Sequence, residues 1–191
     1  MKNLIVIVGV GALGSHVAQF LRGEGDLKVI DFDRVETKNT LAQFHAKSAI
    51  GRNKAEALKQ TMQFLWGVKI NAVPHRLAKE NVSALLDSTS SLIIDCLDNG
   101  PSRRLIQERA RSSGVATLHG ALAADGQFAR VMWDEQFTVD DGAVGAPTCE
   151  GGEHLPFIAT VSGLIARAAQ LFLREGKKVG YVVHPGGVER V

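Results

Sequence analysis

Cysteine is scarce in this chain of 191 residues, which contains only Cys96 and Cys149. Two cysteines without a CxxC pair exclude a disulfide framework and provide no cysteine-based zinc motif. We therefore expect no structural zinc and a cytoplasmic location. A chain of this length buries a sizeable core without cross-links, so residues 1–191 are predicted to form a single domain.

A strong charge of either sign is also lacking. The chain has 22 lysines and arginines against 20 aspartates and glutamates, which gives a formal net charge of +2 at pH 7. Proteins that bind a polyanion through bulk electrostatics carry a larger and more clustered positive charge. The composition therefore predicts that neither nucleic acid nor a membrane surface is the main partner.

No hydrophobic run near the start is long enough to cross a bilayer. The first apolar run, Leu4–Val8, is short and lacks the charged region and small-residue cleavage site of a signal peptide. It leads directly into Gly9-Val10-Gly11-Ala12-Leu13-Gly14 and then into an amphipathic stretch. We interpret Leu4–Val8 as the first strand of a sheet.

Apolar strand-like runs alternate with helical patterns over the first 118 residues. We predict strands at Leu4–Val8, Leu27–Asp31, Val68–Val73, Ser91–Asp95 and Val115–Leu118, and helices at Leu13–Gly23, Lys54–Trp66, Asn81–Leu86 and Arg103–Ser113. This alternation favours a Rossmann-like α/β fold, in which a mostly parallel sheet carries helices on both faces. The carboxyl ends of the strands then share one ligand-binding edge.

The pattern changes after Leu118. The segments His119-Gly120-Ala121 and Asp125-Gly126 are typical of turns, and they enclose an antiparallel extension of the sheet at Phe128–Trp133. Residues 134–155 are predicted to form a long loop, a kind of segment that is often functional. An apolar helix over Pro156–Arg174 and a final edge strand over Gly180–His184 complete the expected fold.

The GxGxxG spacing between a strand and a helix predicts a nucleotide site. Gly9 permits the tight turn, Gly11 lets the backbone approach a phosphate, and Gly14 allows the helix to pack closely on the strand. Asp31, at the end of the second strand, is placed to bind a ribose hydroxyl. The alternative is an ordinary strand-to-helix turn, but the flanking strand and helix favour nucleotide binding.

Further polar residues at particular spacings narrow the chemistry. They occur as Asp31-Phe32-Asp33, Asn39, Gln43, Lys54, Asp95-Cys96-Leu97-Asp98-Asn99 and Arg103. Together with the glycine loop, this order resembles the ThiF/MoeB/HesA superfamily, the bacterial relatives of ubiquitin-activating enzymes. The resemblance runs over nearly the whole chain, from about Ile5 to Ala169.

The resemblance implies a role for each matching residue. Asp31 holds the ribose, Asn39 and Lys54 contact the ATP phosphates, and Asp98 binds Mg²⁺ and orients the α-phosphate. Asp33, Gln43 and Asn99 belong to the same ATP site, and Arg103 lines its pocket. For Asp33, Lys54 and Arg103 taken singly, an ordinary surface position is the alternative.

The sequence departs from the superfamily pattern at several points. Ala42, in Lys38-Asn39-Thr40-Leu41-Ala42-Gln43, takes the place of an arginine that clamps the phosphates. Losing such a donor costs about 2.7–4 kcal/mol of barrier, and Arg34 or Arg52 are candidates to compensate. This chain starts almost at its first strand, so we expect no preceding helix of the kind that delivers an arginine in the superfamily's homodimers. We expect a trimmed or specialised member.

Cys149 lies where many members of the superfamily carry a cysteine that captures the activated carbonyl. A thiolate in an exposed loop attacks an acyl-adenylate readily, and His154 is a candidate base. The neighbouring Glu150 and Glu153 disfavour the thiolate, so a bystander thiol is the alternative. For His119, a contact to the pocket and a structural role are both open, whereas Cys96 is expected to pack in the core.

The resemblance thus implies an ATP- and Mg²⁺-dependent adenylyltransferase that works as a homodimer. Its substrate is the C-terminal carboxylate of a ubiquitin-like sulfur-carrier protein or peptide ending in Gly-Gly, as in thiamine or molybdopterin biosynthesis. A catalytically weak nucleotide-binding partner or scaffold of the same family is one alternative. An NAD-dependent oxidoreductase is the other, although no Tyr-x-x-x-Lys pair stands out in the sequence.

Overall fold

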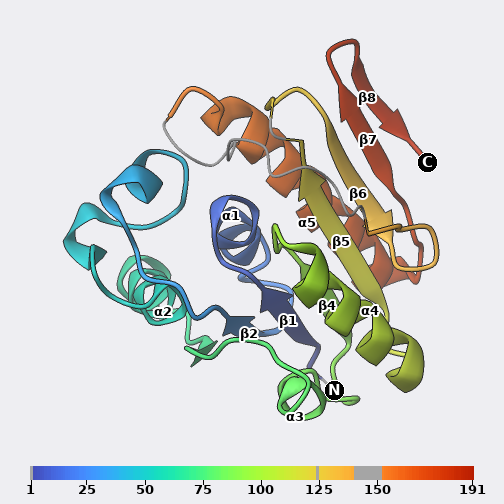
Figure 1. Cartoon of the computed structure of the whole chain (residues 1–191), viewed down its shortest axis with the longest axis horizontal. Coiled ribbons are helices and arrows are strands. Elements are labelled where there is room, and N and C mark those ends of the chain that lie inside the picture. The colour runs from blue at the N-terminus through green and yellow to red at the C-terminus, as the bar shows by residue number, and fades with distance from the viewer. Residues whose placement is uncertain (1, 124, 140–151) are drawn as a thin grey trace.

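A computed structural model of the chain describes residues 2–123, 125–139 and 152–191. Within these ranges one eight-stranded sheet has the order β3-β2-β1-β4-β5-β6-β7-β8 (Figure 1). Its parallel part comprises β1 (Leu4–Val8), β2 (Asp26–Ile30), β3 (Asn71–Val73), β4 (Leu92–Asp95) and β5 (Thr117–Leu122). Its antiparallel part comprises β6 (Ala129–Trp133), β7 (Tyr181–His184) and β8 (Gly187–Arg190). The predicted Rossmann-like α/β fold is confirmed.

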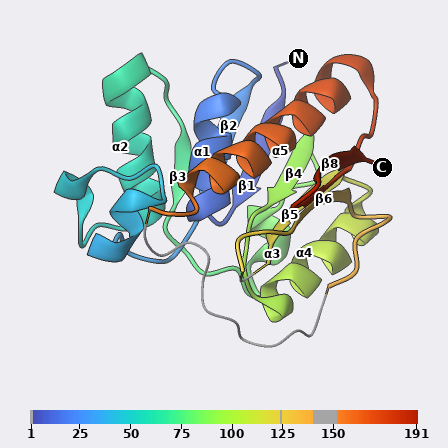
Figure 2. The ribbon, with the colours of Figure 1, turned by 90° about the horizontal axis from the view of Figure 1, so that it is seen from above.

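Helices cover both faces of this sheet (Figure 2). One face carries α1 (Ala12–Phe20), α2 (Lys54–Trp66) and α5 (Leu155–Glu175). The opposite face carries α3 (Val82–Leu85) and α4 (Gly100–Ser113). Two 3₁₀ helices, η1 (Thr37–Leu41) and η2 (Lys47–Ala49), lie between β2 and α2, and the sequence patterns did not predict them.

The central strand β1 is buried on both of its faces. Ile5 and Ile7 pack into the hydrophobic cluster beneath α1, α2 and α5. Val6 and Val8 pack into a second cluster, which Ile93 of β4 and Ile106 of α4 share. A strand covered by helices on both sides needs apolar residues at every position, and this explains the uninterrupted run that marked β1 in the sequence.

Among the described residues, only α5 is long and apolar enough to cross a membrane, by length and composition alone. Its mean hydropathy over 18 residues is 1.4. In the structure α5 packs against α1 and the sheet, and Ile158, Val161 and Ile165 are fully buried there. Its place in the core accounts for its apolar composition.

The predicted turn at His119-Gly120-Ala121 is wrong, because these residues belong to β5. The strand continues to Leu122, which pairs with Ala129 of the antiparallel strand β6. Gly120 is required within the strand, since a Cβ there would lie 2.5 Å from Cδ1 of Ile165 on α5. A residue that usually signals a turn thus serves close helix packing here. The turn predicted at Asp125-Gly126 is present, with a φ of +67° at Gly126.

Two strand boundaries also differ from the expectation. Residues 68–70 precede β3 rather than forming its start, because the N–H of Val68 donates to the carbonyl of Met62 and completes the end of α2. The edge strand is β8 rather than Gly180–His184, and its exposed polar residues carry no alternating apolar pattern. Of the predicted loop 134–155, residues 140–151 lie outside the described ranges, and α5 begins at Leu155.

Candidate nucleotide-binding site

The carboxyl ends of β2, β1 and β4 lie in register at one edge of the sheet, and β5 continues past them. Ile30 pairs with Val8, Val8 with Asp95, and Asp95 with His119. The strand order reverses at β1, which has β2 on one side and β4 on the other. Open α/β sheets bind ligands in the crevice at such a switch point. The site is therefore expected beyond Val8.

The three glycines of the loop after β1 occupy different environments. Gly9 has a φ of +84°, and a Cβ on Gly14 would lie 1.9 Å from the carbonyl oxygen of Gly9. These two glycines are therefore required by the packing of α1 against the loop itself. At Gly11 an added Cβ would meet only the amide nitrogen of Gln43, at 3.9 Å. The backbone at Gly11 is thus open to an incoming ligand.

The peptide groups of Val10 are held from two sides. The N–H of Val10 donates to Oδ2 of Asp31 at 2.8 Å, and its carbonyl accepts from Nε2 of His45 at 2.8 Å. Burial lowers the pKa of His45 to about 4, and the charge of Lys54 adds to this effect. The imidazole is therefore neutral at pH 7 and donates from Nε2, which fixes the loop next to Gly11.

Asp31 and Lys54 bring opposite charges to this edge. Oδ1 of Asp31 accepts from the N–H of Asp33 at 2.8 Å. Burial raises the pKa of Asp31, against the opposing effects of Lys54 and of the N–H groups of Val10 and Asp33. Nζ of Lys54 lies 3.3 Å from Oδ2 of Asp33, and the Lys54 side chain is only 11% exposed. Lys54 is therefore buried and paired with Asp33 rather than placed as an ordinary surface lysine.

The position of Lys54 depends on Asn53, the N-cap of α2. Oδ1 of Asn53 accepts from the N–H of Glu56 at 3.1 Å, while its Nδ2 donates to the carbonyls of Asp31 and Asp33. The N–H of Lys54 also donates to the carbonyl of Asp33, at 2.8 Å. These contacts join the first turn of α2 to the end of β2.

Asn39 and Gln43 are both buried in the segment that joins β2 to α2. Oδ1 of Asn39 accepts from the N–H of Glu36 at 2.9 Å and stabilises the start of η1. Oε1 of Gln43 is buried without a hydrogen-bond partner among the described residues. An unsatisfied buried acceptor costs about 1–3 kcal/mol, so the Gln43 amide beside Gly11 is suited to receive a donor from a ligand.

Asp98 and Asn99 follow β4, and both are exposed. Oδ1 of Asn99 accepts from the N–H of Ser102 at 3.0 Å and caps α4. The loop after β4 touches the glycine loop, because a Cβ on Gly9 would lie 3.0 Å from both the Cys96 carbonyl oxygen and Cδ2 of Leu97. This contact joins the glycine loop to the loop that leads into Asp98.

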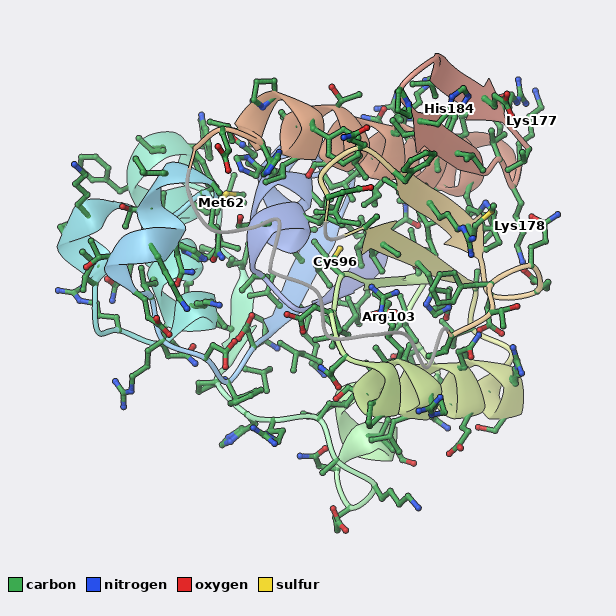
Figure 3. The ribbon with its side chains drawn as sticks, turned by 45° about the horizontal axis from the view of Figure 1, so that its top comes forward. Met62, Cys96, Arg103, Lys177, Lys178 and His184 are labelled. Atoms are coloured by element: carbon green, nitrogen blue, oxygen red, sulfur yellow. The ribbon has the colours of Figure 1, made fainter. Side chains whose placement is uncertain are left out.

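Arg103 differs in position from the other predicted site residues. Its side chain leaves α4 toward the sheet and is buried there (Figure 3). Nη1 lies 3.2 Å from Oδ2 of Asp95, and Nη2 donates to the carbonyls of Gly120, at 2.8 Å, and of Leu97. The guanidinium is thus bound to the ends of β4 and β5.

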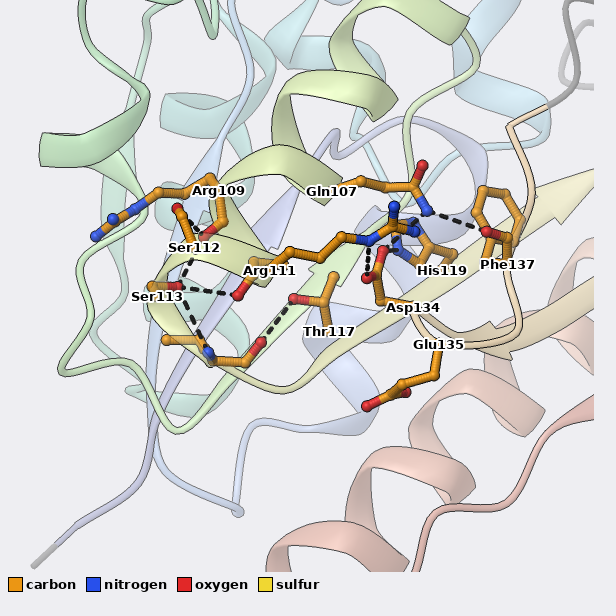
Figure 4. Close-up of polar contacts among 12 residues, drawn as sticks. Gln107, Arg109, Arg111, Ser112, Ser113, Thr117, His119, Asp134, Glu135 and Phe137 are labelled. Carbon is orange, nitrogen blue, oxygen red and sulfur yellow. Dashed lines mark hydrogen bonds and ion pairs between the residues drawn. The ribbon is translucent and has the colours of Figure 1, made fainter.

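His119 is fully buried, and Figure 4 shows its ring beside Asp134. Its Nδ1 lies 2.8 Å from Oδ2 of Asp95 and its Nε2 lies 3.2 Å from Oδ1 of Asp134, while Phe137 stacks on the ring at 4.3 Å. Burial by itself lowers the pKa of His119, but the hydrogen bonds to Asp134 and Asp95 outweigh burial and raise it. The two carboxylates therefore favour the protonated form of the ring.

Asp134 completes this buried group. Gln107 donates to its Oδ1 and Arg111 to its Oδ2, each at 2.9 Å. Burial by itself raises the pKa of Asp134, but the hydrogen bonds from His119, Arg111 and Gln107 outweigh burial and lower it to about 2. We call Asp95, Arg103, His119 and Asp134 the buried charge cluster. The sequence patterns missed Asp134, because its partners come from β5 and α4.

The other residues that the sequence singled out are two cysteines, His154 and Ala42, and they lie in different parts of the chain. Cys149 falls outside the described residues. The partly buried Cys96 packs against the core, and burial raises the pKa of its thiol. A Cβ on Gly126 would lie 2.5 Å from Nδ1 of His154, so that ring lies against the turn between β5 and β6. Ala42 is fully buried, and its carbonyl accepts from Nε2 of His16.

The two arginines expected to compensate for Ala42 are engaged at the surface. Nη1 of Arg34 donates to the carbonyl of Gly51 at 2.7 Å, and Nη1 of Arg52 donates to Oε1 of Gln60 at 2.5 Å. Both contacts are exposed. In this structure, therefore, these contacts hold both guanidinium groups.

Metal ligands are sparse at the site. Within the described ranges, no three side chains of histidine, cysteine, aspartate or glutamate are grouped so as to hold a metal ion by themselves. Mg²⁺ commonly binds through one or two carboxylates together with substrate phosphates and water. The exposed carboxylate of Asp98 beside an open phosphate loop fits that mode of binding.

A parallel sheet that carries a glycine loop, an aspartate and a lysine at its carboxyl edge defines a nucleotide-binding α/β protein. Comparison with known protein families assigns the chain to one family within this class. The model of the ThiF family matches residues 2–174, and the chain belongs to this family. The family resemblance seen in the sequence is confirmed.

Several curated relatives of the chain are named as activating enzymes. The SAMP-activating enzyme E1 of Haloferax volcanii is 31% identical over 93% of this chain and 70% of that protein. The molybdopterin-synthase adenylyltransferase of Escherichia coli is 30% identical over 86% of this chain and 70% of that protein. The sulfur carrier protein adenylyltransferase of Thermus thermophilus is 35% identical over 65% of this chain and 48% of that protein.

Solved structures show the same fold at lower sequence identity. A crystal structure of E. coli MccB with succinimide has a TM-score of 0.81 at 14% identity. It is matched over 99% of this chain and 62% of the MccB chain. Another, of E. coli MccB with ATP, has a TM-score of 0.77 at 13% identity. The present chain thus spans less than two thirds of the MccB chain.

Proposed function

We propose that this chain is an ATP-dependent adenylyltransferase that activates the C-terminal carboxylate of a ubiquitin-like sulfur-carrier protein or peptide ending in Gly-Gly. The observation that carries the proposal is that the glycine loop, Asp31 and the loop leading into Asp98 lie at one carboxyl edge of the sheet, with Lys54 bound beside Asp33. The names of the Haloferax, Thermus and E. coli relatives support this kind of reaction.

Each residue has a role that its position supports. The open backbone at Gly11 and the N-terminus of α1 receive the phosphates, and Asp31 binds the ribose. Lys54 neutralises the charge that develops on the leaving pyrophosphate, with Asn39 and Gln43 beside it as polar contacts. Asp98 holds Mg²⁺, which spreads the phosphate charge when it is bound.

The proposed reaction is an in-line displacement. A carboxylate oxygen of the carrier forms a bond to the α-phosphorus while the bond from that phosphorus to the bridging oxygen breaks. The products are an acyl-adenylate and pyrophosphate. Positioning and electrostatic stabilisation provide the rate acceleration, because the protein forms no bond in this step.

Three finer points belong to the same proposal. The thiolate of Cys149 receives the acyl group and AMP leaves, an exchange of one C–O bond for one C–S bond. The chain works as a homodimer in the cytoplasm, for which light scattering should give twice the mass of 20.5 kDa. A monomer of full activity would contradict the homodimer, and full turnover by Cys149→Ser would contradict the covalent step.

Exchange of pyrophosphate into ATP tests the adenylation step directly. We expect exchange that needs Mg²⁺ and a candidate carrier, and that is lost when the two terminal glycines of the carrier are removed. Lys54→Ala should reduce the exchange rate about a hundredfold or more, as expected for a donor aimed at developing charge. ATP binding without exchange for any carrier would favour the scaffold instead, and displacement of ATP by NAD would favour the oxidoreductase.

A further inference from the structure

The residue before Asp98 is held on both of its backbone polar groups. The N–H of Leu97 donates to Oδ1 of Asp95 at 3.0 Å, and its carbonyl accepts from Nη2 of Arg103. Its side chain lies against Gly9, so Leu97 connects the glycine loop with the loop that carries Asp98. The direction in which the chain enters Asp98 is thus set by two buried charged side chains.

Those two side chains are themselves fixed from deeper in the fold. Asp95 is fully buried and receives His119 and Arg103 on the same oxygen, Oδ2, at 2.8 and 3.2 Å. Arg103 is also bonded to the carbonyl of Gly120 on β5. His119 is joined in turn to Asp134, which follows β6. The cluster therefore ties the Leu97 backbone to β5, α4 and the end of β6.

We propose that Arg103 and His119 are positioning residues, which act through Asp95 and the Leu97 backbone to hold Asp98 in its place beside the phosphate loop. This inference rests on the proposed function, because it assigns the cluster to the same site. It differs from the pocket-lining role that the family resemblance implied for Arg103. Nη2 of Arg103 donates to two backbone carbonyls, and Nη1 faces the carboxylate of Asp95.

The chemistry of the cluster explains why charged groups are used here. A buried carboxylate such as Asp95 is stable only when it is paired and hydrogen-bonded. Nδ1 of His119 and the Arg103 guanidinium both face Oδ2, and Oδ1 accepts from the N–H of Leu97. Charge-assisted hydrogen bonds of this kind have narrow geometry, so they hold a loop more firmly than neutral contacts do.

The two roles for Arg103 predict different kinetics in pyrophosphate exchange. As a positioning residue, Arg103→Gln should lower kcat about ten- to a hundredfold and leave the Kd of ATP, measured without Mg²⁺, within about twofold. A phosphate contact would instead weaken ATP binding. His119→Gln, which donates to only one carboxylate, should shift kcat in the same direction by less. Arg167→Gln, on the exposed side of α5, removes the same charge and should change neither quantity.

A double-mutant cycle tests whether Arg103 acts through Asp98. In an Asp98→Asn background, Arg103→Gln should cause little further loss of kcat, because the group that it positions is already gone. If Arg103→Gln lowers kcat by the same factor in the wild-type and Asp98→Asn backgrounds, the proposal is overturned. Circular dichroism and the Tm show which variants fold. If Arg103→Gln does not fold, Arg103→Lys, which keeps the positive charge, is used in its place.

Amide hydrogen exchange provides a readout that needs no turnover. The N–H of Leu97 should be protected in the wild-type chain, and Arg103→Lys and His119→Gln should speed its exchange at least tenfold while β1 stays protected. Unchanged protection in both variants would overturn the inference even if adenylation is confirmed. Absence of pyrophosphate exchange in the wild type would overturn the proposed function alone, because this loop measurement would still stand.

Discussion

Two buried histidines at the site edge shift their pKa in opposite directions because they face different partners. His119 lies between two carboxylates that raise its pKa, so its contribution to stability is present below pH 6.5 and is lost as pH rises through its raised pKa. Burial lowers the pKa of His45 to about 4, helped by the charge of Lys54 and opposed by the hydrogen bond to the Val10 carbonyl. The same residue type thus serves a charged and an uncharged contact within one site.

His45 should make the fold sensitive to acid. Its pKa is about 4 in the folded chain against an ordinary value of 6.5, so the unfolded chain binds the extra proton between these values. Stability should therefore fall by about 3 kcal/mol as pH drops from 6.5 to 4, from 1.36 kcal/mol for each pKa unit. Urea unfolding at several pH values measures this dependence.

The variant His45→Gln provides the matched control for that measurement. Its amide can still donate to the Val10 carbonyl but does not titrate, so its stability should fall less over the same pH range. All other titrating groups are common to both proteins, and the difference between the two pH profiles isolates His45. Two parallel profiles would contradict the assignment of a neutral His45.

At the scale of elements, the glycine loop and α1 form one packed unit. Gly14 lies on the first turns of α1, so close to the carbonyl of Gly9 that helix and loop touch without any side chain between them. Ser15 strengthens this join, since its hydroxyl donates to the carbonyl of Gly11 and accepts from the N–H of Phe44. The segment after η1 therefore braces the N-terminal turn of α1.

Alanine substitution should separate the structural glycine from the ligand-binding one. Gly14→Ala places a methyl group 1.9 Å from a backbone oxygen, and such overpacking costs about 1–3 kcal/mol. At about 2–4 °C for each kcal/mol, its Tm should fall by several degrees. Gly11→Ala should leave Tm nearly unchanged but weaken ATP binding at least tenfold. Equal effects on Tm, or normal ATP affinity of Gly11→Ala, would contradict these roles.

At the scale of the whole molecule, α5 joins the parallel half of the sheet to the antiparallel extension. Its residue Ile165 is fully buried close to Gly120 of β5, where Leu13 of α1 also lies. The helix comes late in the chain but covers α1, which comes first (Figure 2). Residues distant in sequence therefore share one core.

Ile165→Ala should lower the stability of the entire fold. Removing this side chain leaves a cavity at the junction of three elements, which costs about 2–5 kcal/mol. We expect one urea transition with a lower midpoint and an unchanged m-value, because the sheet unfolds as a unit. Phe64→Ala is the control, since Phe64 is 88% exposed and its loss should cost within about 0.5 kcal/mol. Two separate transitions would show that the halves unfold independently.

Much of the fold and part of the site follow from local patterns. We could recognise in the sequence the apolar runs at β1, β2 and β4 and the glycine spacing before α1. Buried parallel strands and phosphate loops restrict the residue type at each position, which makes such patterns visible. Asp31 and Asp98 stay predictions, made because Asp31 comes directly after β2 and Asp98 lies just past the end of β4. The strand β8 and the 3₁₀ helices were missed, since exposed short elements place no such restriction on sequence.

By itself, then, the sequence determined the mostly parallel sheet, the loop between β1 and α1, and the family of the chain, because apolar runs and motif spacings specify them. Only the tertiary structure decided that Arg103 faces Asp95, that His119 lies between two carboxylates, and that Oε1 of Gln43 is buried without a partner among the described residues. Those outcomes depend on burial and on partners brought from other strands and helices. Charge state and direction of a side chain are properties of its surroundings, which local spacing does not encode.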